Sequence, residues 1–362
     1  MADRRLTILL VLSRLERRWV GGIGRVTSAM ARALAERGHD VHLAGRAEDP
    51  EAVQPLAGVT LHPWPGAGPK LRQVPSLLTT LARLQPDVVH FHAALPHGEV
   101  VAAALARRGR GRRPLIACTP HTGSRWDRVG RRAHFGLVRS DLVVAPCEWG
   151  RERAIAAGVS PERARSVLNG IELPELPASS SRGPIVLAMG RLVPSKGHDL
   201  LVDAFGRISG EEPGWSLVVG GEGPLLPSLQ SRVEELDIPV KLPGRMDAAR
   251  KRDLFARASI GVVPSRDDMM PGVMLELQAH GIPVVATPVG GLVEAAQEGK
   301  AARLVAAPTV EALAEGLREL MASESLRCQL GSEARRVSAE RSWPVLAEQL
   351  ERHYSLALRR RG

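Results

Sequence analysis

The fold is decided by the stretch PIVLAMGRLVPSKGHDLLVDAF, Pro184 to Phe205. Its first six residues are apolar and predict a buried strand, and the residues after Gly197 have the spacing of an amphipathic helix. Glycines bound the turn between them, which carries Arg191 and Lys196. Ligands of doubly wound sheets bind beyond the carboxyl ends of the strands, where such a turn lies. The two cations are therefore placed to neutralise a diphosphate.

The same alternation of strand and helix runs through the whole chain. Apolar, β-branched runs predict strands at 6–12, 40–45, 87–91, 114–118 and 141–145, and again at 184–189, 215–220, 239–244, 260–265 and 282–287. Helical periodicity fills most of the intervals, as in Val26–Gly38. Repeated strand–helix–strand units predict right-handed crossovers and parallel sheets covered by helices on both faces. Two such series predict an α/β protein with two Rossmann-like, doubly wound domains.

A length of 362 residues fits two domains of about 150 to 200 residues each. The seam between the two series is the segment 169–184, where Pro, Ser and Gly replace periodic apolar residues. We predict an N-terminal domain of residues 1–172, a linker of 173–183 and a C-terminal domain of 184–341. An amphipathic helix at about 342–361 is expected to pack back on the first domain, and ligands are expected in the cleft between the domains.

The net charge of +10 is unevenly distributed along the chain. Residues 1–180 hold 26 Lys and Arg against 16 Asp and Glu, whereas the remainder holds 23 of each. The basic residues concentrate at 107–113 and 125–139, which are either solvated surface charges or an electropositive surface for an acidic acceptor or an anionic membrane. Nucleic acid is disfavoured as a partner because only 3% of the residues are aromatic and no recognition motif accompanies the basic stretches.

The chain has no run of 18 apolar residues and no signal-peptide cleavage site at its start. We therefore expect a cytoplasmic protein, with a peripheral position on the inner membrane leaflet as a second option. The three cysteines show no metal-ligand spacing, so no structural metal is expected.

A glycine-rich segment, VGGIGRVTSAM, follows the first predicted strand and opens a helix at Val20–Met30. It is similar to a dinucleotide fingerprint, but its spacing is GGxG rather than GxGxxG. The single tyrosine, Tyr354, lies near the C-terminus and leaves no catalytic Tyr-x-x-x-Lys for a short-chain dehydrogenase. The segment is still suited to binding an anion, because its glycines allow a ligand to approach the backbone closely and the free N–H groups at the helix start attract negative charge. A plain tight turn is the alternative.

Taken together and in order, eight motifs make the chain resemble the GT-B glycosyltransferases of glycosyltransferase family 4. They are GGIG (21–24), HFH (90–92), TPHTG around His121, VLNGIE (167–172), GRLVPSKG (190–197), GGEGP (220–224), LPGRM (242–246) and the stretch Asp268–Val285. The resemblance implies an enzyme that moves a sugar from a nucleotide donor to an acceptor with retention at the anomeric carbon.

The resemblance also implies roles for individual residues. Arg191 and Lys196 would bind the two donor phosphates, and the backbone of Gly22 would contact the same diphosphate from the other domain. His121 would lie near the reaction centre, unless it only makes structural hydrogen bonds. The acceptor side is assigned to Gly24, His90, His92 and Arg125.

The family's carboxylate pair is usually Glu-x7-Glu, and here it is Asp268 and Glu276. Glu276 would hold the ribose hydroxyls and Asp268 would face the sugar, although Asp268 could instead cap a helix. The backbone N–H groups of the loop Met270, Pro271 and Gly272, at the start of the helix, are a further candidate contact for sugar hydroxyls or phosphate. Arg245 and Met246 fall in the base-binding loop. A UDP-sugar is the favoured donor and a GDP-sugar is the alternative.

We expect a front-face mechanism in which the departing diphosphate takes the acceptor's proton, with neither a metal ion nor a cofactor. The acceptor would be a small molecule, a glycan or a lipid-linked molecule. Two rival functions stay open at this point. They are a nucleotide-sugar epimerase of the same shape and a non-catalytic nucleotide-binding module.

Overall fold

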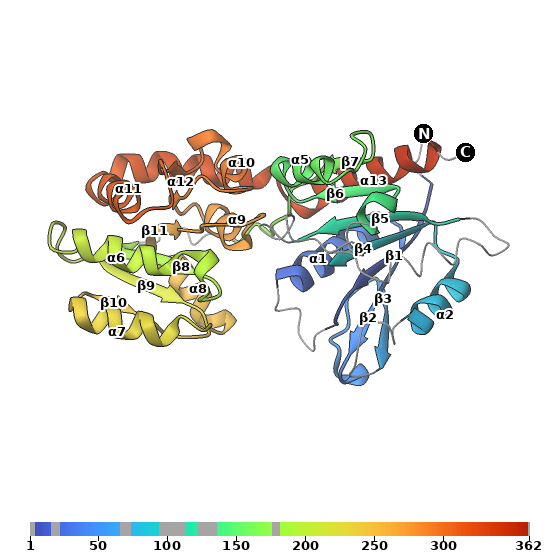
Figure 1. Ribbon diagram of the computed structural model, residues 1–362, viewed down its shortest axis with the longest axis horizontal. Coiled ribbons are helices and arrows are strands. Elements are labelled where there is room, and N and C mark those ends of the chain that lie inside the picture. Colours follow the sequence, from blue (N-terminus) through green and yellow to red (C-terminus); the bar gives the residue numbers. More distant parts are fainter. Residues whose placement is uncertain are drawn as a thin grey trace. The chain divides into compact units, whose positions relative to one another are not determined.

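The computed structural model describes residues 4–15, 22–65, 74–93, 113–121, 136–175 and 182–360 (Figure 1). The chain forms two compact units. The N-terminal unit comprises Met1–Gly170 and Trp343–Gly362, and the C-terminal unit comprises Ile171–Ser342. The chain passes from one unit to the other at Gly170–Ile171 and at Ser342–Trp343, close to the domain ends expected at residues 172 and 341.

In the described part of the N-terminal unit, seven parallel strands form one sheet in the order β3-β2-β1-β4-β5-β6-β7. The strands are β1 (Thr7–Leu12), β2 (Asp40–Ala47), β3 (Val59–Pro65), β4 (Val88–Ala93), β5 (Leu115–Pro120), β6 (Leu142–Ala145) and β7 (Ala164–Ser166). The helices are α1 (Gly22–Glu36), α2 (Val74–Leu84), α5 (Glu148–Ala156) and α13 (Trp343–Arg359), with a 3-10 turn, η1, at Pro50–Ala52.

In the C-terminal unit, the described residues give six parallel strands in the order β10-β9-β8-β11-β12-β13. The strands are β8 (Gly183–Met189), β9 (Ser216–Gly220), β10 (Val240–Lys241), β11 (Ala258–Val263), β12 (Val284–Ala286) and β13 (Arg303–Leu304). The helices are α6 (His198–Ile208), α7 (Leu226–Leu236), α8 (Ala248–Arg257), α9 (Gly272–Ala279), α10 (Leu292–Ala295), α11 (Val310–Ala322) and α12 (Glu324–Ala339), with 3-10 turns η4 (Pro194–Lys196) and η5 (Gln297–Gly299).

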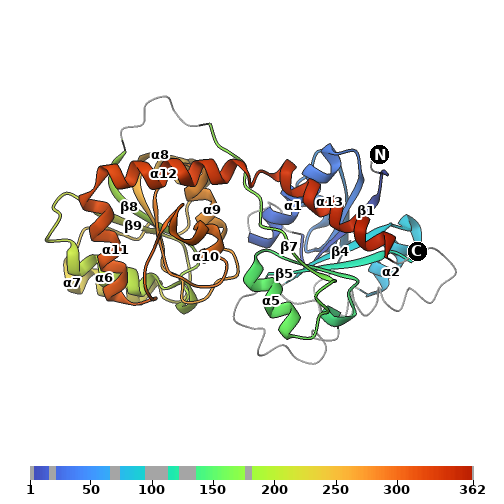
Figure 2. The same ribbon diagram turned by 90° about the horizontal axis from the view of Figure 1, so that it is seen from above.

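These sheets confirm the predicted fold class, two parallel sheets flanked by helices. Each of the ten apolar runs singled out in the sequence contains a strand. In the C-terminal unit, α6 and α11 lie side by side in Figure 2 and bury Leu201, Phe205, Leu313 and Leu317 in the same core. In the N-terminal unit, non-adjacent strands β1 and β4 pair at the centre of the sheet.

The C-terminal helix α13 belongs to the core of the N-terminal unit. It lies alongside α1 (Figures 1 and 2), and its residues Leu346, Leu350 and Tyr354 share a cluster with Leu34. Burying each such side chain contributes about 1.5–3 kcal/mol. Among the described residues, the Nε atom of Arg37 lies 2.6 Å from the buried carboxylate of Glu351 and fixes the helix against α1. The helix α13 is thus part of the helical layer that packs on the sheet of the N-terminal unit.

Two further observations concern surfaces. Of the two basic stretches, residues 107–112 and 125–135 lie outside the described residues. No helix within the described part of the chain combines the length and the apolar composition needed to span a membrane.

Candidate functional site

In the C-terminal unit, two loops that follow neighbouring strands are joined to each other. The carbonyl oxygen of Ser195, after β8, accepts hydrogen bonds from the backbone N–H groups of Arg266 and Asp267, after β11, at 2.9 and 3.2 Å. Arg266 also binds Asp199 through both guanidinium nitrogens, at 2.7 and 2.6 Å. These contacts fix the relative positions of the two loops before any ligand binds.

Gly197 makes the close approach of these loops possible. Its φ of +67° is left-handed, and a Cβ atom there would lie 1.9 Å from the carbonyl oxygen of Pro264. Only glycine fits both conditions. The sequence GRLVPSKG therefore ends in glycine because the backbone at Lys196 must turn sharply against the end of β11.

Lys196 and Asp268, predicted from separate motifs, form an ion pair. The Ser265 hydroxyl donates a second hydrogen bond to the Asp268 carboxylate at 3.2 Å. The Asp268 side chain is largely buried, with 12% exposed. It does not cap a helix, because α9 begins at Gly272 and has Pro271 at its N-cap. The structural alternative considered for Asp268 is therefore wrong.

Glu276 lies on α9 and is buried, with 8% exposed. Its carboxylate forms an ion pair with Lys251 of α8. Lys251 was not predicted as a site residue. One sequence signal could have found it: the chain has only five lysines among 49 basic residues, and two of the five, Lys196 and Lys251, sit on the two carboxylates of this site.

Three other predicted donor residues, Arg191, Arg245 and Met246, follow the strands β8 and β10 in the sequence. Arg191 and Arg245 are exposed, and among the described residues no hydrogen bond or ion pair involves either guanidinium. Met246 packs against the glycine loop after β9, since a Cβ atom on Gly220 would lie 2.0 Å from its terminal methyl group. Arg191 and Arg245 therefore present charge to solvent, while Met246 shapes the predicted base loop.

The loop before α9 is apolar, and most of it is buried. Met270 and Pro271 are buried, and Gly272 is the exposed first residue of the helix. The first N–H groups of a helix have no partner within it. In the described part of the chain, no side chain caps the start of α9, so its first backbone N–H groups are not occupied by a capping side chain.

In the N-terminal unit, Gly22 and Gly24 lie in the first turn of α1. A Cβ atom at either position would meet no atom within 4 Å in the described chain. Packing of the chain itself therefore does not require glycine at either position.

Three histidines line up across β4 and the end of β5. The Nδ1 atom of His92 lies 3.3 Å from Nε2 of His121, and the rings of His90 and His92 are 4.3 Å apart. His90 is fully buried and makes hydrogen bonds through both nitrogens, to the Tyr354 hydroxyl at 2.6 Å and the Thr119 hydroxyl at 2.8 Å. These bonds account for both ring nitrogens of His90 without a ligand.

Burial makes these histidines poor bases. Desolvation lowers the pKa of His90 to about 3 and that of His121 to about 4, and it holds the pKa of His92 well below its usual range. All three rings are neutral near pH 7. The Nε2 atom of His92 is buried and has no hydrogen-bond partner in the part of the chain that is described.

The structure thus joins Lys196 with Asp268, Glu276 with Lys251, and His92 with His121. Arg125 lies outside the described residues. Within the described ranges, no group of three or more His, Cys, Asp or Glu side chains is placed to hold a metal ion.

Two family models match the chain, and together they cover most of it. Residues 172–337 match the model described as glycosyl transferases group 1, and residues 20–175 match the model of glycosyltransferase family 4.

Curated relatives agree with these families. A D-inositol 3-phosphate glycosyltransferase of Acidothermus cellulolyticus is 31% identical over 79% of this chain and 74% of its own length. A glycogen synthase of Mycobacterium tuberculosis is 27% identical over 94% of this chain and 92% of its own. An exopolysaccharide phosphotransferase of Streptomyces coelicolor is 31% identical over 59% of this chain, which covers only 23% of that protein.

Solved structures share the fold over almost the full chain. The sucrose-phosphate synthase of Thermosynechococcus elongatus superposes with a TM-score of 0.78 and 21% identity, covering 98% of this chain and 100% of its own. The Anabaena protein HepE in complex with UDP gives a TM-score of 0.77 and 17% identity, covering 97% of this chain and 100% of its own.

Proposed function

Since the chain belongs to the group 1 glycosyltransferases and has their GT-B fold, we propose that it is a retaining enzyme that transfers a sugar from a nucleotide diphosphate to a hydroxyl acceptor. The observation that carries the proposal is the Lys196–Asp268 pair, held by two loops at the carboxyl ends of β8 and β11. A cation and a carboxylate side by side suit a ligand that has both phosphates and hydroxyl groups. Sugar nucleotides have both.

The donor side of the proposal uses the residues of the C-terminal unit. Lys196 and the unpaired Arg191 bind the diphosphate, and Asp268 accepts a hydrogen bond from a sugar hydroxyl. Glu276 accepts hydrogen bonds from the ribose, with Lys251 holding its carboxylate in place. Because Lys196 already has a partner, donor binding must divide this cation between a phosphate and Asp268.

A UDP-sugar is the donor we favour. Its support is the fold shared with HepE, which has been crystallised with UDP and with UDP-glucose. We expect backbone groups of the loop at Arg245 and Met246 to recognise the nucleotide base. A GDP-sugar is therefore the second candidate for the donor.

The proposed chemistry is a front-face substitution. The bond between the anomeric carbon and the diphosphate oxygen breaks, the acceptor oxygen bonds to the same face of that carbon, and the acceptor's proton passes to the departing diphosphate oxygen. Lys196 and Arg191 stabilise the negative charge that develops on the leaving group. Positioning of the two substrates supplies up to about 7–11 kcal/mol of the barrier reduction.

His121 does not serve as a general base in this proposal. Its pKa of about 4 leaves the ring neutral at pH 7. A base with so low a pKa is too weak to take a proton efficiently from an acceptor hydroxyl. The neutral ring is instead suited to a hydrogen bond with a donor-sugar hydroxyl, oriented by its contact with His92 at 3.3 Å.

We also propose that the reaction needs neither a metal ion nor a cofactor, and that the protein works in the cytoplasm. The acceptor is a small molecule, a glycan or a lipid-linked molecule. The test for metal independence is full activity after treatment with EDTA, and loss of activity that Mg²⁺ restores would reject it.

A panel of UDP- and GDP-sugars tested by thermal denaturation is the first experiment. A ligand at 100 times its Kd stabilises a protein by about 2.7 kcal/mol, which moves the melting temperature measurably. The sugar nucleotide that shifts the wild type should fail to shift Glu276→Ala, while Glu311→Ala, an exposed carboxylate of α11, serves as the matched control. No shift with any nucleotide sugar would reject the donor class.

The same samples separate transfer from epimerisation. The proposed enzyme leaves the sugar configuration of an isolated donor unchanged and passes the sugar to an added acceptor mixture. Formation of a new epimer from donor alone, detected by NMR, would replace the proposal with the epimerase.

A further inference from the structure

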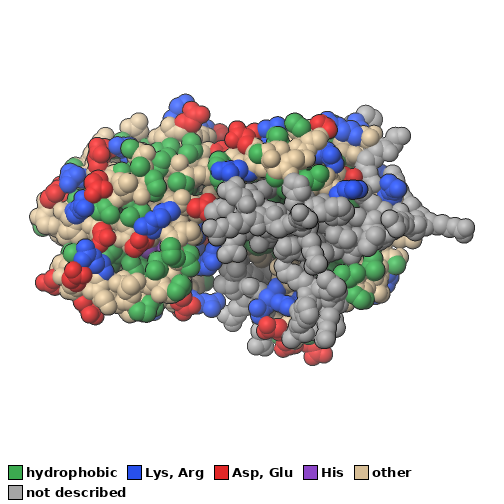
Figure 3. Space-filling view, in the orientation of Figure 1, with side chains coloured by type: hydrophobic (Ala, Val, Ile, Leu, Met, Phe, Trp, Pro, Cys, Tyr) green, Lys and Arg blue, Asp and Glu red, His purple; other side chains and the backbone are tan. Residues whose placement is uncertain are grey.

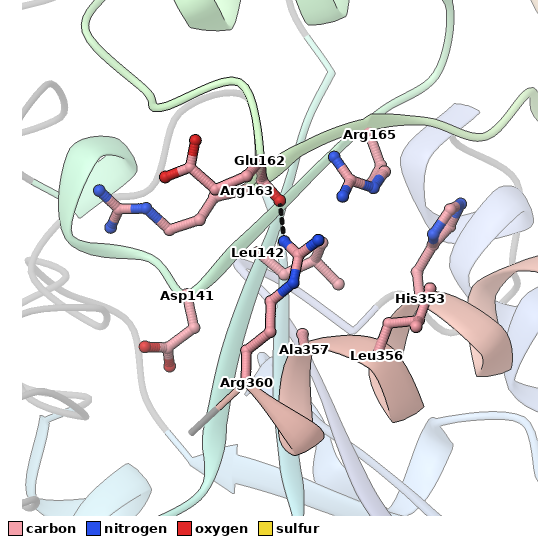
Figure 4. A pocket seen from close by; sticks show the side chains of 9 residues that line it. All are labelled: Asp141, Leu142, Glu162, Arg163, Arg165, His353, Leu356, Ala357 and Arg360. Carbon is pink, nitrogen blue, oxygen red and sulfur yellow. Dashed lines mark hydrogen bonds between the residues drawn. The ribbon is translucent and has the colours of Figure 1, made fainter. Parts of the chain in front are cut away.

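The N-terminal unit contains a cavity of about 170 Å³ in which basic side chains gather. Figure 4 shows it between the end of α13 and the strands β6 and β7. Its lining residues are Asp141, Leu142, Glu162, Arg163, Arg165, His353, Leu356, Ala357 and Arg360. Its volume is below the roughly 300–1,000 Å³ of sites for drug-sized ligands, so an occupant that fits it is a small group.

The cavity lies at the opposite edge of the sheet from the histidines described above. Asp141 and Leu142 stand at the amino end of β6, and Arg163 immediately precedes β7. His92 and His121 stand at the carboxyl ends of β4 and β5. Since all these strands are parallel, the two sets of residues occupy opposite edges of one sheet. The cavity is therefore separate from the proposed reaction site.

The three arginines of this cavity donate their hydrogen bonds to the backbone rather than to carboxylates. Among the described residues, Arg163, Arg165 and Arg360 form no ion pair, and their hydrogen bonds go to backbone oxygens. Arg165 donates to the carbonyl oxygen of Ala164 at 2.7 Å, and Arg360 donates to that of Glu162 at 2.6 Å. Each of these bonds uses one terminal nitrogen, which leaves further N–H donors on both side chains.

Arginines elsewhere behave differently. On the C-terminal unit, Lys and Arg alternate with Asp and Glu over the face seen in Figure 3. Several exposed arginines there have acidic partners, as in Arg207–Glu311, Arg232–Asp203 and Arg318–Glu211 at 2.6–2.7 Å. Three arginines that form no ion pair with any described residue thus gather around one cavity, and two of them, Arg163 and Arg165, belong to the positive excess of the first half of the chain.

The lining also holds two acidic side chains, and Glu162 interacts electrostatically with Arg163 and Arg360, which contributes to the lowered pKa of its carboxyl group. Asp141 accepts a hydrogen bond from the backbone N–H of Ile116 at 2.8 Å. In Figure 4 the exposed carboxylate of Glu162 points away from Arg165 and His353. The guanidinium of Arg163 also points away from them, so Arg165 and Arg360 form the centre of the positive cluster, with the ring of His353 on the same side.

His353 faces this cluster from α13. Its Nδ1 atom is buried without a hydrogen-bond partner among the described residues. Burial first, and then the nearby Arg165 and Arg352, lower the pKa of its ring. The end of α13 presents helix carbonyl groups, which repel anions. Attraction for an anion therefore comes from the guanidinium groups rather than from the helix.

We propose that this cavity binds a phosphoryl group, held by Arg165 and Arg360 and hydrogen-bonded by His353. The planar guanidinium fork matches the oxygens of phosphate, and two forks can hold one phosphate from two sides. Leu142, Leu356 and Ala357 line the same cavity and would contact the carbon chain of a phosphate ester. The phosphoryl group belongs either to a soluble phosphate ester or to a lipid headgroup, and the experiment distinguishes these sources.

The test uses the full chain and follows the ring of His353 by NMR, with His353→Gln to assign its signal. Inorganic phosphate and glycerol 3-phosphate are the soluble probes, and vesicles of phosphatidylglycerol or of phosphatidylcholine are the lipid probes. We expect a saturable shift of the His353 signal and a higher pH of titration with bound phosphate. Arg360→Gln should weaken binding at least fivefold, and Arg165→Gln/Arg360→Gln should abolish it.

Two controls keep the result specific. Arg359→Gln changes an exposed neighbour outside the cavity and should bind like the wild type. Lys196→Ala removes a cation of the donor site and should leave the His353 shift intact. A response to soluble esters identifies a soluble ligand, and a response to phosphatidylglycerol alone identifies a headgroup. Absence of both responses, or equal binding by the doubly substituted protein, would overturn the proposal.

Discussion

The hydroxyl of Tyr354 lies 2.6 Å from Nδ1 of His90, and this contact joins the last helix of the chain to the centre of the first sheet. Both side chains are fully buried. The other nitrogen of His90 contacts Thr119, and its ring lies next to that of His92. A helix near residue 354 therefore helps to order the histidines at the carboxyl ends of β4 and β5.

Substituting Tyr354 by Phe tests this connection. The change keeps the ring and removes one hydrogen bond, so Nδ1 of His90 stays buried without its partner. Such a loss costs about 1–3 kcal/mol of the free energy of unfolding, measured by urea denaturation. Leu358→Ala, a partly buried apolar position of the same helix, separates this effect from a general weakening of α13. If Tyr354→Phe is as stable as the wild type, the bond has no structural role.

The low pKa of His121 predicts a pH effect on stability. In the folded protein the pKa is about 4, while the ordinary value is 6.5, so the unfolded chain takes up the proton first. The contribution of the ring to stability is therefore complete above about pH 7 and falls as the pH drops from 6.5 towards 4. His121→Asn should lose less unfolding free energy between pH 7 and pH 5 than the wild type does. Between pH 8 and pH 7 the two proteins should change equally, and an equal loss at low pH would contradict the assignment.

Lys196 and Arg191 should differ in what they do for turnover. Removing a group that stabilises developing charge costs about 10²–10³ in kcat, and we expect Lys196→Ala to reach that range. Arg191→Ala should lose less, because its exposed guanidinium has no fixed partner in the described structure. Initial rates with saturating donor measure both, and Arg207→Ala, an exposed arginine of α6, is the control. Near-normal transfer by Lys196→Ala would remove it from the phosphate site.

Lys251 offers a separate test of the carboxylate it pairs with. Lys251→Met leaves Glu276 buried without its cation, so the KM for the donor should rise more than kcat falls if the pair holds the ribose. Glu276→Gln, which keeps the shape but not the charge, should raise the KM as well. Steady-state kinetics against donor concentration measures both variants. An unchanged KM in both would assign the pair to folding alone.

The sequence predicted the central strands of each sheet better than the edge strands. The three strands that were not predicted, β3, β7 and β13, all stand at the edge of a sheet. Central strands of parallel sheets are buried on both faces and read as continuous apolar runs, whereas an edge strand such as Ala164–Ser166 need not. Hydrophobic patterning therefore found only one of the four edge strands in the described sheets, β10, within the run 239–244.

The candidate site follows the same logic. Lys196 and Asp268 could be found because each stands beside a glycine-bounded turn with its own sequence signature. Lys251 is one of several basic residues of α8 and has no glycine-bounded turn beside it. The scarcity of lysine is its one sequence signal, and only tertiary packing brings it to Glu276. The role of His90 was also hidden, since its partner Tyr354 is 264 positions away.

The tightest constraint in the donor loops is at Gly197, and it gives the most direct test of how they are built. The backbone of Gly197 is left-handed, with a φ of +67°, which disfavours any side chain. A Cβ atom at this position would also lie 1.9 Å from the carbonyl oxygen of Pro264. The backbone conformation alone costs a side chain about 1–2 kcal/mol, and relieving the collision requires the loop carrying Lys196 to move away from β11. Gly197→Ala should therefore lose more than about 2 kcal/mol of unfolding free energy and most of its affinity for nucleotide sugar, measured by calorimetry. Gly210→Ala is the matched control, because a Cβ atom there meets no atom within 4 Å and its φ is not left-handed, so its stability should be unchanged or slightly higher. If Gly197→Ala binds nucleotide sugar as the wild type does, the spacing between the Lys196 and Asp268 loops is not what determines donor binding.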